Sequence, residues 1–79
     1  MNTLKIDRHP VAVNVSVTEA ALEVELADGR KISVPIVWFP RLEAATEKER
    51  NDWQLLGNGQ GIHWPRLDED ISVLGLLST

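Results

Sequence analysis

Alternation of apolar and polar residues across the first half of the chain constrains its fold more than any other feature. Three runs have a period of two, which is typical of β-strands that bury one face. The apolar residues expected on the buried face are Val11, Val13, Val15 and Val17 in the first run, Leu22, Val24 and Leu26 in the second, and Ile32, Val34 and Ile36 in the third. These runs predict three strands that share one apolar face.

Two local signals define how these strands connect. Asp28-Gly29 separates the second and third runs and indicates a hairpin, because glycine accepts the positive φ that such a turn requires. Pro35 has no N–H to donate to a ladder, so it places the end of the third strand at a sheet edge or a bulge. We therefore predict a three-stranded antiparallel meander.

The second half of the chain predicts short helices and a second hairpin. Pro40 suits the first position of one helix, and Thr46 with Glu49 matches a capping box at the start of another, which ends near Asp52. Two further segments predict strands joined by a glycine-rich turn over residues 57–61, and a last segment predicts a helix with Asp68 as its N-cap. These segments are Trp53–Leu56 and Ile62–Trp64 for the strands and Glu69–Leu74 for the helix.

Together these elements predict a small α+β fold. One domain over residues 11–79 holds all of them, and residues 1–10 are expected to form a mobile N-terminal extension. A chain of 79 residues buries only about 60% of its unfolded surface on folding, so its stability alone should be modest. A partner or a second copy would add stability by mass action.

Composition excludes several classes of protein. The chain has no cysteine, which rules out a disulfide framework, a thiol nucleophile and cysteine-ligated zinc. It has no apolar stretch near the roughly 20 residues of a membrane span, and its start does not resemble a signal peptide, so we expect a cytoplasmic protein. The net charge of −4, with eight Lys and Arg scattered among twelve Asp and Glu, argues against binding of nucleic acid by this chain alone.

The chemically unusual residues lie in the last third of the chain. The glycine-rich segment over residues 57–61 lacks the lysine of a phosphate loop and is better explained as a turn. His63 with Asp68 and Asp70 suggests either a divalent-metal site or a general base with an orienting acid. The structural alternative packs His63 on a strand face while Asp68 caps a helix. His9 is the one other histidine of the chain, so a site with several histidines would need a second chain, and no nucleophile accompanies the group. We therefore predict no enzyme, no bound metal and no cofactor.

The aromatic residues suggest a surface for protein binding. Trp38, Phe39, Trp53 and Trp64 are all the aromatics of the chain, and most of them should be buried in so small a domain. Any that is exposed beside arginine would have the composition of a protein interface. The residues predicted to bind a partner are Trp38, Arg41, His63, Trp64, Arg66 and Asp68. In this hypothesis the arginines supply forked donors, Asp68 pairs with or caps a neighbour, and the tryptophans fill pockets.

Three stretches resemble one known family. They are Asp28-Gly29-Arg30, the segment from Pro35 to Leu42 that contains W-F-P-R-L, and the segment from Gly61 to Leu77 that contains G-I-H-W-P-x-L-D-E-D-I-S-V. The chain resembles the short bacterial family known as domain of unknown function 2442. The resemblance implies a small α+β domain, sometimes fused to a helix-turn-helix domain and often encoded beside a second small protein. It also implies no established catalytic residues.

The resemblance and the residues together favour one function. They predict a non-enzymatic interaction module that acts as the antitoxin-like component of a two-gene toxin–antitoxin pair. The expected partner is a small protein encoded by the adjacent gene, with a homo-oligomer as another possibility, and no membrane. The chain ends at Thr79 without a helix-turn-helix extension, so DNA binding is not expected. The alternative is a small-ligand or divalent-metal-binding domain that uses His63, Asp68 and Asp70.

Overall fold

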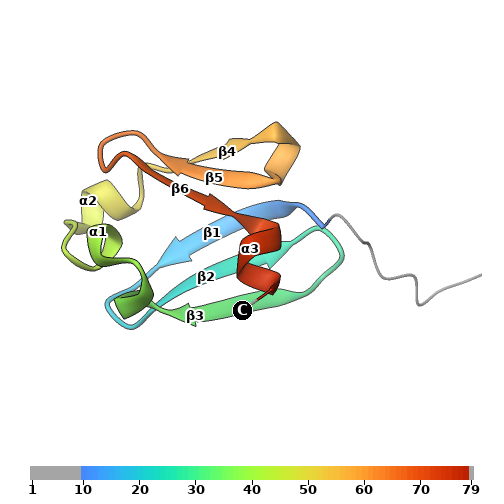
Figure 1. Ribbon diagram of the computed structural model, residues 1–79, viewed down its shortest axis with the longest axis horizontal. Helices are drawn as coiled ribbons and strands as arrows, with labels where there is room; N and C mark the ends of the chain where they lie inside the picture. Colours follow the sequence, from blue (N-terminus) through green and yellow to red (C-terminus); the bar gives the residue numbers. More distant parts are fainter. Residues whose placement is uncertain (1–9, 79) are drawn as a thin grey trace, which may run out of the picture.

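The three alternating runs form one antiparallel sheet, as the sequence predicts. The computed structural model describes residues 10–78, in which β1 (Ala12–Val17), β2 (Ala21–Leu26) and β3 (Lys31–Pro35) lie in the order β1-β2-β3 (Figure 1). Strand β3 is an edge strand, which confirms the position expected for Pro35. The predicted N-terminal extension over residues 1–10 lies outside the described residues, except for Pro10, which is buried.

The turn between β2 and β3 confirms the predicted hairpin. Gly29 has a φ of 95°, and its N–H donates to the carbonyl oxygen of Leu26 over 3.0 Å. The Arg30 side chain donates from Nε to the Asp28 carboxylate over 2.9 Å, and the Arg30 backbone N–H donates to it as well. These hydrogen bonds lower the pKa of Asp28 below its ordinary value, so its carboxylate stays ionised to a more acidic pH than that of a free aspartate.

Strand β1 departs from the predicted alternation. The pairing with β2 shifts between Ala12 and Asn14, so that a bulge places Ala12 in the core and leaves Val13 52% exposed. The prediction that Val13 faces the core is therefore wrong, whereas Val15 is buried as predicted. A residue far along the chain packs against this bulge, since a Cβ on Gly59 would lie 2.4 Å from the carbonyl oxygen of Ala12. Two backbones meet there, and only small residues fit between them.

The second half of the chain forms a second sheet of three strands. It has the order β4-β5-β6, with β4 (Gln54–Leu56), β5 (Gly61–Trp64) and β6 (Glu69–Ser72). The predicted hairpin of β4 and β5 is confirmed, although Gly61 belongs to β5 and not to the turn. Between them lies the 3₁₀ turn η2 (Gly57–Gly59), in which all three residues have positive φ.

The predicted helix over Glu69–Leu74 is wrong. Residues 69–72 pair with β5, and Ile71 lies opposite Ile62 with both side chains buried. The gain from adding a buried residue to the sheet outweighs the helix-start signal of the carboxylates. Helix α3 (Val73–Leu77) begins directly after β6. Its N-cap is Ser72, whose hydroxyl accepts a hydrogen bond from the Gly75 N–H. Asp68 is not an N-cap but the last residue of the β5–β6 turn, with a φ of 51°.

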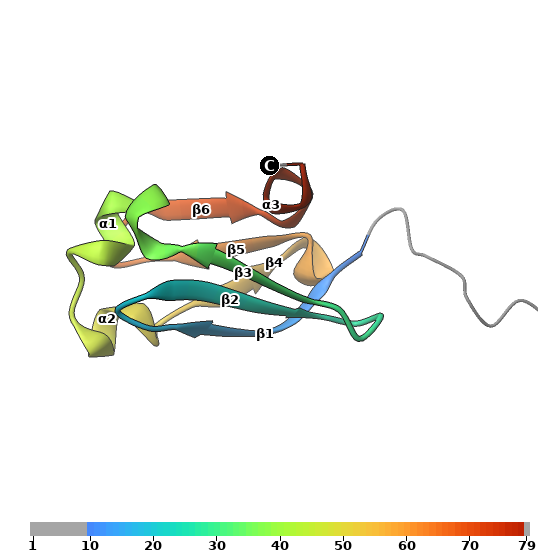
Figure 2. The ribbon, with the colours of Figure 1, turned by 90° about the horizontal axis from the view of Figure 1, so that it is seen from below.

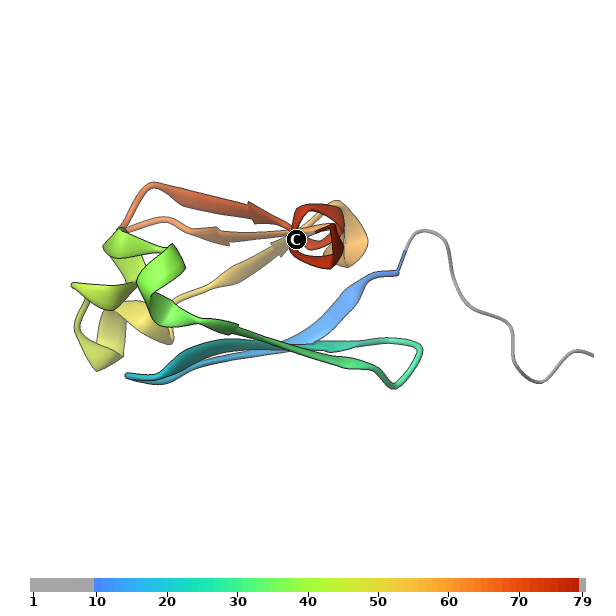
Figure 3. The ribbon, with the colours of Figure 1, turned by 60° about the horizontal axis from the view of Figure 1, so that its bottom comes forward.

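Short helical segments connect the two sheets. The 3₁₀ turn η1 (Ile36–Trp38) leads into α1 (Pro40–Glu43), where Pro40 occupies the first position as predicted. Helix α2 (Glu47–Arg50) begins with the predicted capping box of Thr46 and Glu49. The two sheets face each other as layers, with α1 and α2 at one end and α3 toward the other (Figures 2 and 3).

Both sheets contribute to a single core. Trp64 is its largest fully buried side chain, and its Nε1–H donates to the backbone carbonyl of Arg50 over 3.0 Å. The Arg50 side chain in turn donates to the carbonyl oxygens of Leu42 and Glu43, so it caps the C-terminal end of α1. No helix within residues 10–78 is long and apolar enough to cross a membrane. The buried apolar side chains are Ala12, Val15, Leu22, Val24, Leu26, Val34, Ile36, Leu42, Ile62, Trp64, Ile71, Val73 and Leu76.

Two glycines with nearly the same φ allow a test of the contact between the sheets. Gly59 (φ 98°) abuts the Ala12 backbone, whereas a Cβ on Gly29 (φ 95°) would meet nothing within 4 Å. We expect Gly29→Ala to cost about 1–2 kcal/mol from the left-handed backbone alone. Gly59→Ala should cost about 1–3 kcal/mol more, because it adds a steric clash. Urea unfolding of both variants measures the difference, and equal losses would show that Gly59 does not hold the sheets together.

Candidate functional site

The turn η1 presents two large apolar side chains to solvent. Ile36 is buried, whereas Val37 is 60% exposed and Trp38 is 51% exposed. The turn is held at both sides, because the Phe39 N–H donates to the Ile36 carbonyl oxygen over 2.9 Å and Pro40 then begins α1. Tryptophan side chains are highly buried on average, so one that is half exposed on an ordered turn is uncommon. Trp38 is therefore the first residue of the candidate site.

A hollow of about 300 Å³ lies next to Trp38. It is formed where η1 approaches β6 and α3, and its lining combines apolar side chains with two carboxylates. The lining residues are Trp38, Phe39, Glu69, Asp70, Ile71, Ser72, Gly75 and Leu76. We call this hollow and the exposed residues Val37 and Trp38 the Trp38 surface. Its shape and its charge suit an apolar side chain that is accompanied by a basic group.

Arg41 and Asp68 meet beside the Trp38 surface. The Arg41 guanidinium donates through Nη1 to the backbone carbonyl of Asp68, and this hydrogen bond joins α1 to the β5–β6 turn. Arg41 thus contributes a structural contact as well as a positive charge. The structure brings the predicted residues Arg41 and Asp68 together, but the contact is made by the Asp68 backbone and not by its carboxylate.

His63 and Asp70 form a pair across β5 and β6. They are opposite one another in the strand register, and His63 Nδ1 contacts Asp70 Oδ1. An ionised carboxylate only accepts hydrogen bonds, so Nδ1 is the donor of this contact when Asp70 is ionised. Asp68 is not a member of this pair, and residues 10–78 contain no group of three His, Cys, Asp or Glu placed to hold a metal ion. His9 lies outside the described residues.

Two of the predicted partner-binding residues lie elsewhere. Trp64 is fully buried, so its indole belongs to the core and does not reach a partner in this structure. The physical reason is that Trp64 lies on the same inward face of β5 as Ile62, with its Nε1–H bonded to the Arg50 carbonyl at the end of α2. Arg66 pairs with Asp52 through Nε and Oδ2 over 3.2 Å, beside a shallow hollow near Lys48 and not at the Trp38 surface.

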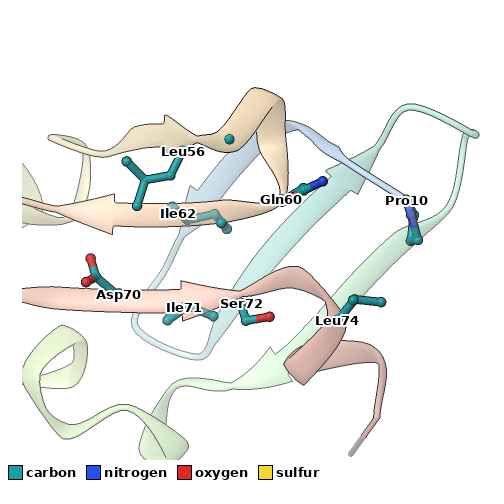
Figure 4. Close-up of a pocket in the computed structure, with 10 residues that line it drawn as sticks. Pro10, Leu56, Gln60, Ile62, Asp70, Ile71, Ser72 and Leu74 are labelled. Atoms are coloured by element: carbon teal, nitrogen blue, oxygen red, sulfur yellow. The ribbon is translucent and has the colours of Figure 1, made fainter. Parts of the chain in front are cut away.

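Sequence reasoning also missed one pocket. A pocket of about 500 Å³ lies on the second sheet, and Gly61, Leu56 and Leu74 are among its lining residues (Figure 4). The signal was available, because a glycine within a strand often marks a close approach by a ligand or by another chain. The pattern hides this signal, because Gly61 also fits the glycine-rich turn that precedes the strand.

Comparison with known proteins identifies the family. The model of the family DUF2442, described as a protein of unknown function, matches residues 12–79. The chain belongs to the DUF2442 family. This DUF2442 protein is similar to a crystal structure of a protein of unknown function from Rhodospirillum rubrum ATCC 11170, at 31% identity and a TM-score of 0.73, over 87% of this chain and 86% of that one. None of the curated proteins matches the chain.

The division between core and surface tryptophans is testable with one substitution at two positions. Trp64→Phe removes the donor to the Arg50 carbonyl and leaves a gap in the core, so we expect a loss of about 1–3 kcal/mol in the free energy of unfolding. Trp38→Phe should change that free energy by no more than about 0.5 kcal/mol, because Trp38 is half exposed. Urea unfolding followed by circular dichroism compares the two, and a larger loss for Trp38→Phe would contradict the assignment.

Proposed function

We propose that this DUF2442 protein is a non-enzymatic, cytoplasmic interaction module that binds a small protein through the Trp38 surface. The observation that carries the proposal is the exposure of Val37 and Trp38 side by side on η1 while Ile36 is buried. Tryptophan is enriched at the centres of protein interfaces, where it supplies a large apolar contact. Trp38 is exposed in the free chain, so its indole is available for such a contact with a partner.

The way in which η1 is held favours tight binding. Ile36 anchors one side of the turn in the core, and the Arg41–Asp68 hydrogen bond anchors the helix that follows. A side chain on a segment that is already ordered loses less conformational entropy when it binds. The Trp38 surface is therefore suited to recognition of a partner without rearrangement of the fold.

The charge near Trp38 indicates the chemistry of the partner. Glu69 and Asp70 line the hollow, and the whole chain carries a net charge of −4. A basic partner would be attracted at long range and then placed with an apolar side chain in the hollow. This is consistent with an antitoxin-like role, in which the partner is a basic, toxin-like protein encoded by the adjacent gene.

Two valines allow a matched test of the proposal. Val37 and Val13 are both more than half exposed, but Val13 lies on the bulge of β1, outside the Trp38 surface. After co-expression with the product of the adjacent gene, we expect tagged wild-type protein and Val13→Ser to recover the complex and relieve a growth defect. Val37→Ser should recover less, and Trp38→Ala should weaken binding by about 30-fold, as a central interface residue does.

Calorimetry on the purified proteins measures these affinities, and unfolding curves verify that each variant is folded. Absence of any complex with the co-expressed protein, or equal affinity of all the variants, would rule out the proposal.

A further inference from the structure

The pocket that sequence reasoning missed lies on the outer face of the second sheet. Leu56, Gly61 and Ser72 are opposite one another in β4, β5 and β6, so they form one cross-strand row. Because Ile62 next to Gly61 is fully buried, this row faces away from the core. Gly61 has no side chain and forms the floor of the pocket. In Figure 4 Asp70 lies at one end of the pocket, and Pro10 and Leu74 lie at the other.

The fold does not require a glycine at position 61. Its φ is not in the left-handed region, and a Cβ there would meet its nearest neighbour, the Ile71 carbonyl oxygen, at 3.6 Å, an ordinary contact. Gly59 is the opposite case, because its Cβ would clash with a backbone. A glycine inside a strand costs about 0.5–1 kcal/mol relative to alanine. What Gly61 contributes is room for a small group beside the Leu56 side chain, whose Cβ would lie 3.7 Å from an added Cβ.

The lining of the pocket indicates what would fill that space. Leu56 and Leu74 form apolar walls, and both are substantially exposed in the free chain. Among the lining residues that the structure describes, Asp70 carries the one charged side chain, and it is 69% exposed. His63 contacts Asp70 Oδ1, which orients the carboxylate and leaves its second oxygen as an acceptor.

We propose that this pocket binds a small organic cation with an apolar body. The body packs over Gly61 between Leu56 and Leu74, and its ammonium group pairs with Asp70. The volume of about 500 Å³ lies within the range of small-molecule sites, which are mostly apolar with a few polar groups that orient the ligand. The pocket adjoins the hollow of the Trp38 surface, because Asp70, Ile71 and Ser72 line both, whereas Gly61, Leu56 and Leu74 line this pocket and not the hollow.

Titration of the whole chain with three matched probes tests the proposal. The probes are 2-phenylethylamine, its neutral analogue 2-phenylethanol and the acid 3-phenylpropionate, each at millimolar concentration and followed by amide chemical shifts. We expect the amine to shift the amide signals of Leu56, Gly61, Asp70 and Ser72. The alcohol should bind about tenfold more weakly or worse, because it lacks the charge that pairs with Asp70. The acid should not bind.

Substitutions in the pocket locate the binding. Asp70→Asn keeps the shape of the side chain and should lower the affinity for the amine about tenfold, to that for the alcohol. Gly61→Val should abolish binding of both, since it fills the floor, and Gly61→Ala serves if the valine variant does not fold. Gly75→Ala is the matched control, because its Cβ would also make only ordinary contacts but lies outside this pocket.

Three outcomes would overturn the proposal: no shifts at the pocket with the amine, equal affinity for amine and alcohol in the wild type, or unchanged affinity in folded Gly61→Ala and Gly61→Val. None of these depends on the partner protein. Conversely, Gly61→Ala should leave the affinity for the partner protein unchanged, so failure of one proposal is distinguishable from failure of the other.

Discussion

The burial of Trp64 is the constraint on which the rest of the structure depends. Its indole is the largest fully buried side chain of the core to which both sheets contribute. The buried indole N–H needs an acceptor, and the Arg50 carbonyl supplies it. The Arg50 side chain then holds the carbonyl end of α1. One chain of contacts thus runs from the core through α2 to α1, which follows directly on the turn that carries Trp38.

The Trp38 surface results from where Trp38 lies in the fold, and not from its being a tryptophan. Trp38 lies two positions before a proline and Trp64 directly before one. Trp38 follows an edge strand, however, whereas Trp64 lies on the inner face of a central strand. Position in the sheets therefore decides which of them is exposed to solvent. The Arg41–Asp68 contact adds rigidity at the Trp38 surface, and Glu69 and Asp70 add negative charge. An apolar anchor with charges around it is the usual arrangement of a protein-binding site.

The glycines of the last third of the chain serve two different purposes. Gly59 allows the second sheet to touch the backbone of β1, and the bulge at Ala12 forms at the same contact. Gly61, two residues later, meets no such obstacle and leaves a pocket beside Asp70. Within a segment whose sequence predicts one turn, Gly59 therefore allows the contact between the sheets and Gly61 lines a candidate ligand site.

The sequence by itself determined the features that depend on neighbouring residues. These are the meander of the first three strands, the Asp28-Gly29 hairpin, Pro40 at the start of α1 and the capping box of Thr46 and Glu49. Each is decided by groups only a few positions apart, so a local pattern is enough to predict it. Only the tertiary structure decided the bulge in β1, the third strand over Glu69–Ser72, the burial of Trp64 and the pocket at Gly61. These depend on packing and pairing between segments that are separate in the chain, such as Gly59 against Ala12, and no local pattern records which distant backbone or side chain will be the neighbour.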